Sequence, residues 1–131
     1  MLQLTRAVVS ELKYRVETVQ CKDWGVEVRL REMTAGRFQR YQEALKKLRE
    51  NGEGDSAEVS VSLLQNSIVD FETEELLFAD AEGAEILRNQ GISGLVYLAE
   101  EAMRINNMSQ AKIDEAAENF ENGQSEDSSS D

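Results

Sequence analysis

Carboxylates are the only side chains with catalytic potential that this chain carries in quantity. Its 131 residues include 26 aspartates and glutamates, 14 lysines and arginines, one cysteine and no histidine. Without histidine the chain cannot form a Ser-His-Asp triad, a Cys-His dyad or a histidine-ligated zinc or haem site. The one cysteine, Cys21, cannot form an internal disulfide or a cysteine-rich metal site, and it indicates a reducing compartment.

Three carboxylates are spaced like the first ligands of a calcium loop. Asp70, Glu72 and Glu74 lie at positions i, i+2 and i+4. The sixth position of such a loop should be glycine and the twelfth glutamate, but Glu75 and Ala81 occupy them. A solvated acidic turn is the better interpretation, and the chain has no glycine-rich phosphate-binding motif. Paired acids for glycoside hydrolysis cannot be located by spacing alone. We therefore predict no metal site and assign no catalytic or cofactor-binding residue.

Two other features could mediate binding. Trp24, the one tryptophan, either packs a hairpin end on the core or anchors an interface. A basic cluster could contact phosphates, but the net charge of -12 and the lack of interleaved aromatic residues argue against nucleic acid. Within this cluster Arg37 and Arg40 are the candidates for contact with an acidic protein surface. The cluster comprises Arg29, Arg31, Arg37, Arg40, Lys46, Lys47 and Arg49.

Charge is distributed unevenly along the chain. Residues 1 to 50 hold 11 bases and 7 acids, for a net charge of +4, and residues 51 to 131 hold 3 bases and 19 acids, for a net charge of -16. One interpretation is two solvated surfaces that serve solubility. The other is head-to-tail self-association, in which the basic part of one copy meets the acidic part of the next. Such contacts between unlike surfaces build rings or filaments.

The alternation of apolar and polar residues predicts a small antiparallel hairpin near the N-terminus. One strand is expected over residues 14 to 20 and the other over Val26–Arg31, with a loop of about five residues that ends at Gly25. Val26, Val28 and Leu30 should share one face of the second strand.

Helical periodicity predicts most of the remaining structure. Thr5, Thr34 and Asp80 are expected to cap helices, and Asp55 should begin a capping box with Glu58. Leu76 to Phe78 should form a short buried piece, and Ile92, Leu95, Ala99, Ala102 and Met103 should form the apolar stripe of a helix. The fold class is therefore mainly α with a small N-terminal β-hairpin (α+β) and about five helices. The expected helical segments are a short one over residues 6 to 12, then Ala35–Glu50, 57 to 69, 81 to 89, Ile92–Ile105 and 110 to 121.

The last expected helix has a modest apolar face formed by Ile113, Ala117 and Phe120. This face either docks on its own domain or binds a neighbouring copy or a client chain. Residues 122 to 131 contain no large apolar side chain and are expected to form a disordered acidic tail. A single folded domain should therefore cover residues 1 to 121.

Nothing in the sequence suggests a membrane or export. No stretch approaches the roughly 18 apolar residues that a membrane span needs. Glu11 interrupts the N-terminal apolar segment, which does not have the pattern of an export signal. We expect a cytosolic protein with no membrane contact.

Three segments, in this order, resemble the tail assembly chaperones of long-tailed (siphovirus-type) bacteriophages. The first is Trp24-Gly25, a strand, and then REMTAGR at residues 31 to 37 leading into a helix. The second is SIVD at residues 67 to 70, before Leu77-Phe78. The third is INNMS at residues 105 to 109, followed by ENF at residues 118 to 120. The sequence departs from the family pattern after Asp70. Similar proteins usually have a glycine-containing turn there, whereas this chain has Phe71-Glu72-Thr73.

The resemblance implies a function in assembly and no catalysis. Such a chaperone coats the tape measure protein in the host cytoplasm, holds it soluble until tail tube subunits polymerise around it, and is absent from the mature virion. Its partners would be the tape measure protein, its own copies in a head-to-tail oligomer, and the tail tube protein through a frameshift-extended form. The competing hypothesis is a small acidic regulator that mimics nucleic acid and blocks a DNA-binding partner.

Overall fold

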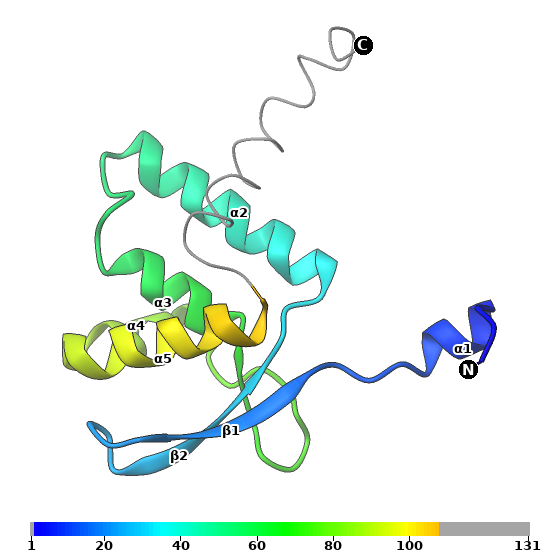
Figure 1. Cartoon of the computed structure of the whole chain (residues 1–131). Coiled ribbons are helices and arrows are strands. Elements are labelled where there is room, and N and C mark those ends of the chain that lie inside the picture. Colours follow the sequence, from blue (N-terminus) through cyan, green and yellow to red (C-terminus); the bar gives the residue numbers. More distant parts are fainter. Residues whose placement is uncertain (1, 108–131) are drawn as a thin grey trace, which may run out of the picture.

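The computed structural model describes residues 2 to 107. Figure 1 shows a body of four helices and a small sheet, from which a fifth, N-terminal helix projects. This arrangement confirms the mainly helical α+β class and adds one strand that the sequence pattern did not predict. The elements in chain order are α1 (Arg6–Ser10), β1 (Val16–Cys21), β2 (Val26–Arg31), α2 (Ala35–Glu50), α3 (Glu58–Gln65), β3 (Ile68–Val69), α4 (Ala81–Arg88) and α5 (Ile92–Ile105).

The predicted hairpin is present. β1 and β2 pair antiparallel, with Val19 opposite Val28, and β1 extends to Cys21 rather than ending one residue earlier. Gly25 closes the turn with φ +68°, a conformation that glycine adopts without steric cost, and its N–H donates to the Cys21 carbonyl at 2.9 Å. Val28 and Leu30 are buried as predicted, but Val26, next to the turn, is 52% exposed because the core does not cover this end of the strand.

The structure corrects the prediction of one helix over residues 57 to 69. α3 ends at Gln65, where the Asn66 and Ser67 side chains donate to the carbonyls of Ser62 and Leu63. Ile68 and Val69 then form β3, which pairs antiparallel with Leu30 and Arg29 of β2. The sheet order is therefore β1-β2-β3, with β2 in the centre.

The predicted capping box at Asp55 is also wrong. The N-cap of α3 is Ala57, which makes no side-chain capping bond, and the Glu58 N–H donates to the Ser56 hydroxyl at 3.2 Å. The other three predicted caps are confirmed. The side chains of Thr5, Thr34 and Asp80 each accept a hydrogen bond from the backbone N–H three residues later.

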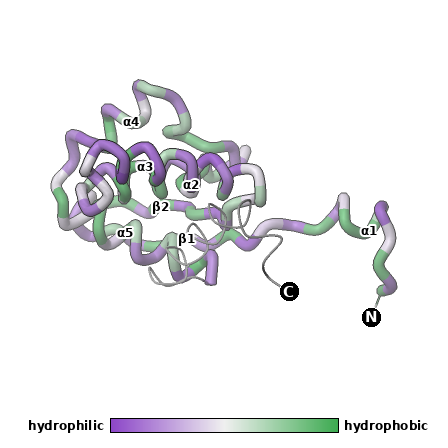
Figure 2. The backbone as a smooth tube through the Cα atoms, turned by 90° about the horizontal axis from the view of Figure 1, so that it is seen from above, coloured by the Kyte–Doolittle hydropathy of each residue, from purple (hydrophilic) through white to green (hydrophobic). Residues whose placement is uncertain are grey.

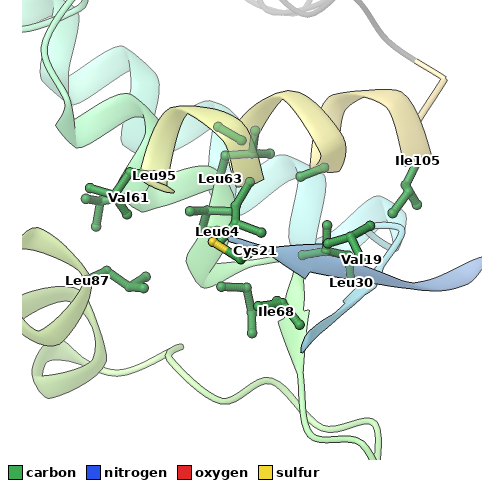
Figure 3. Packing of buried hydrophobic residues seen from close by; sticks show 14 of the residues in the cluster. Val19, Cys21, Leu30, Val61, Leu63, Leu64, Ile68, Leu87, Leu95 and Ile105 are labelled. Atoms are coloured by element: carbon green, nitrogen blue, oxygen red, sulfur yellow. The ribbon is translucent and has the colours of Figure 1, made fainter. Parts of the chain in front are cut away.

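The core lies between the sheet, α5, which packs on it, and α3, which packs on α5 (Figure 3). Leu30, Leu64 and Leu98 are completely buried there, and Cys21 fills space among them as a small apolar side chain. The α5 stripe differs from the prediction at its first position. Ile92 is 56% exposed, and Ile105 at the other end of the helix is buried.

The segment between β3 and α4 is a surface turn rather than a buried piece. Leu77 is half exposed, and only Phe78 packs partly on the core. The Asp70 carboxylate accepts hydrogen bonds from the N–H groups of Glu72 (2.8 Å) and Thr73 (2.9 Å). These bonds from Thr73 and Glu72 hold the pKa of Asp70 below its usual value. The acidic triplet thus shapes a turn, as the sequence suggested.

Two ion pairs fasten helices to their neighbours. Arg104 of α5 pairs with Glu17 of β1 at 2.8 Å, and Arg88 of α4 pairs with Glu58 of α3 at 2.6 Å. The hydrogen bonds from the two guanidinium groups lower the pKa values of both glutamates. Each pair links elements that are far apart in the sequence.

These ion pairs make the free energy of unfolding depend on pH. The pKa of Glu58 is lower in the folded protein than in the unfolded chain, where it is near 4.5. The ionised carboxylate therefore stabilises the fold at pH values above 4.5. This stabilisation is lost as the pH falls through the pKa of the folded protein. Urea unfolding of the Glu58→Gln variant should therefore show lower stability than wild type at pH 7 and a smaller difference at pH 3. The control is Glu72→Gln, which removes an exposed loop carboxylate. Equal effects of the two variants would contradict the pairing.

Candidate protein-interaction site

The described part of the chain offers surfaces for binding and no centre for metal chemistry. Within residues 2 to 107 no group of three potential metal ligands lies close enough to hold an ion. In the same range no helix has the length and apolar character to cross a bilayer. The carboxylate of Glu74 from the acidic triplet pairs with Arg29 at 3.0 Å.

Trp24 packs the hairpin turn against α5. A Cβ placed on Gly94 of α5 would lie 2.5 Å from the indole Nε1, so the ring rests directly on the glycine. The side chain is half-buried and contacts the core cluster. This is the packing that the sequence left open, but the same residue also lines an open groove.

The groove lies between the hairpin turn and α4, and we call it the hairpin–α4 groove. Its volume is about 500 Å³. Its floor is apolar, and two of its aliphatic side chains, Val26 and Ile86, are 52% and 46% exposed. The lining residues are Asp23, Trp24, Val26, Phe78, Ile86, Leu87 and Gln90. Periodicity did not reveal this site, because an exposed valine in a strand follows the same alternation as a buried one.

A second apolar surface lies on α5, and we call it the α5 strip. Ile92, Val96 and Tyr97 are all exposed on this helix. Ile92 and Val96 are four residues apart and therefore share a face. The buried stripe of Leu95, Leu98 and Ala99 holds α5 on the core. α5 thus has apolar residues on two sides.

The two predicted arginines lie at the other end of β2 from Trp24. Arg37 is in the first turn of α2, which Thr34 caps, and Arg40 follows three residues later. Partial burial, together with repulsion from Arg40 and Arg31, lowers the pKa of Arg37. The guanidinium of Arg31 is held by the Glu74 carbonyl at 2.8 Å and lies over the Tyr14 ring at 4.7 Å. The structure therefore concentrates positive charge here, in what we call the arginine cluster: Arg31, Arg37 and Arg40.

The remaining predicted site residues belong to the C-terminal part of the sequence, beyond residue 107. Ile113, Ala117 and Phe120, the helix predicted to carry them and the predicted tail over residues 122 to 131 lie outside the described residues. Trp24 and the two arginines do not form one site, because β2 separates them.

Comparison with known proteins identifies the fold. No family model matches the sequence, and no curated protein matches it significantly. Among solved structures, the chain is similar to the tail assembly chaperone of bacteriophage HK97, with a TM-score of 0.55 and 22% sequence identity over 79% of this chain and 95% of that chain. The chain has the fold of a phage tail assembly chaperone. The resemblance inferred from sequence segments is confirmed at the level of the fold. The candidate interaction surfaces on this fold are the hairpin–α4 groove, the α5 strip and the arginine cluster.

Trp24 provides a spectroscopic test of this arrangement. The Gly94→Ala variant places a methyl group in the space of the indole, so we expect a loss of about 1–3 kcal/mol in the free energy of unfolding and a red-shifted emission of the one tryptophan. The control is Gly91→Ala, where an added Cβ meets nothing within 4 Å. Unchanged emission in Gly94→Ala would contradict the contact.

Proposed function

We propose that this protein is a phage tail assembly chaperone that binds the tape measure protein and keeps it soluble during tail assembly. The supporting observation is the fold, which is similar to that of the HK97 tail assembly chaperone with a TM-score of 0.55 over 95% of that chain. It acts without catalysis, in the host cytoplasm, and is not retained in the mature virion. The segment order in the sequence supports the same assignment independently of the fold.

The composition suits this function. A tape measure protein is very long, helical and apolar, so its solubility requires many copies of a small binding protein. Self-association in a head-to-tail array supplies those copies along one client. The net charge of -12 keeps the coated complex dispersed.

The α5 strip is the surface that we assign to the client. Ile92 and Val96, which are exposed and share one face, match the way in which one helix lays an apolar face against another, and the exposed Tyr97 lies beside them. α5 is held firmly enough to present them, because its opposite side is buried in the core and Arg104 ties its last turn to Glu17. A client helix can therefore bind without rearrangement of the domain.

The arginine cluster and the last predicted helix serve contacts between copies in this proposal. Arg37 and Arg40 meet the acidic C-terminal part of a neighbour, and Ile113, Ala117 and Phe120 contribute an apolar face. A frameshift-extended form would link the array to the tail tube protein.

Co-expression with the tape measure protein tests the proposal. Wild-type protein should move the tape measure protein from the insoluble to the soluble fraction. The double variant Ile92→Glu/Val96→Glu should lose most of this effect, because it places two charges in the apolar contact. Its circular dichroism should stay that of wild type, since both side chains are exposed.

The matched control is Leu77→Glu, the same kind of change at a half-exposed residue of the β3–α4 turn. It should retain the solubilising effect. If wild type leaves the tape measure protein insoluble, the proposed function is wrong. Steep loss of partner binding with added salt would instead support the acidic regulator, because apolar contacts are less sensitive to salt.

A further inference from the structure

The N-terminal arm, residues 2 to 13, is the part of the described chain that its own domain leaves uncovered. It extends from the body and includes α1, which has no buried residue (Figure 1). Leu2 and Leu4 are 80% and 79% exposed, and Val9 and Leu12 are also exposed. Figure 2 shows the hydrophobic positions of this arm standing apart from the body.

Such an arm is expected to require a partner. α1 has five residues, and a helix of this length is not stable in water without tertiary contacts. Four large aliphatic side chains in one projecting segment also expose more apolar surface than solubility favours. A surface that covers them would stabilise both the helix and the complex.

The arm leaves the domain in a direction that takes it away from its own groove. Arg15, at the base of the arm, is fixed to Glu32, the residue that follows β2. The Arg15 carbonyl accepts from the Glu32 N–H at 2.8 Å, and the Arg15 N–H donates to the Glu32 carboxylate at 2.7 Å. Tyr14 is held under the Arg31 guanidinium. The arm therefore leaves the domain at the start of β1, whereas the hairpin–α4 groove lies at the turn after the end of β1. The six extended residues of β1 separate these two points by about 20 Å.

We propose that the N-terminal arm of one copy docks in the hairpin–α4 groove of the next. The aliphatic side chains of the arm match the apolar floor formed by Trp24, Val26 and Ile86. The charges are also complementary. The arm carries Arg6 and Lys13 against Glu11, whereas Asp23 lines the groove and α4 with its cap has three acids and one base.

This contact joins two different surfaces, so in an open row of copies one end keeps a free arm and the other end keeps a free groove until the row closes. Such a heterologous contact gives rings or open filaments rather than isolated twofold dimers. The inference rests on the self-association within the proposed function and adds a contact to those assigned there to the arginine cluster and the last predicted helix. It makes no use of the α5 strip, which stays available to the client.

Cysteine cross-linking between two variants of the full chain tests the proposal. One variant carries Leu4→Cys in the arm and the other carries Ile86→Cys in the groove. Native Cys21 is 1% exposed and should not react. After mild oxidation of the mixture, docking should raise the yield of the covalent heterodimer about tenfold or more over the control, because it raises the effective concentration of the two thiols. The control pairs Leu4→Cys with Glu72→Cys, on an exposed turn outside the groove.

A single chain that carries both Leu4→Cys and Ile86→Cys separates the possible occupants. A ladder of covalent oligomers supports docking between copies. A disulfide closed within one chain, or a heterodimer yield no higher than the control, overturns it. If light scattering gives the same oligomer mass before and after deletion of residues 2 to 12, the arm makes no contact between copies, and self-association stands through the other surfaces. Solubilisation of the tape measure protein is scored separately, so the failure of one proposal does not imply the failure of the other.

Discussion

The structure depends on β2, the central strand of the sheet. Its register with β1 and β3 turns Val28 and Leu30 into the core, on the side of the sheet where α5 packs. The same register places Arg29 and Arg31 where they hold the acidic turn after β3 through Glu74. A slip of one residue in the pairing of β2 would turn the two arginines toward the core and the two apolar residues away from it. The core and the contacts with Glu74 would both be lost. One strand thus organises the helices, the turn and the direction of the N-terminal arm.

This construction leaves apolar side chains outside the core at separate places. The groove lies beyond one end of the hairpin, the arm leaves from the other end, and the α5 strip lies on the helix that crosses the sheet. Separate apolar surfaces of this kind suit a protein that binds several partners at once. The strong negative charge keeps such a protein dispersed while these surfaces are free.

Local signals predicted the elements that are long and strongly periodic. Ala35–Glu50 and Ile92–Ile105 have the bounds expected from their caps and stripes, and so does Val26–Arg31. β3 was missed because two residues have no period, and its pairing with β2 depends on contacts across the sequence. Of the candidate site, the arginines and Trp24 were recognisable by residue type. The groove and the α5 strip were not, since Ile92 fits an apolar stripe equally well whether a neighbour covers it or not.

The central claim is that many copies coat one long client, and the mass of the complex tests it most directly. Tape measure segments of increasing length would be co-purified with the protein, and the mass of each complex measured by light scattering. The account predicts that the number of bound copies rises in proportion to segment length. A fixed number of copies, whatever the length of the segment, would contradict it.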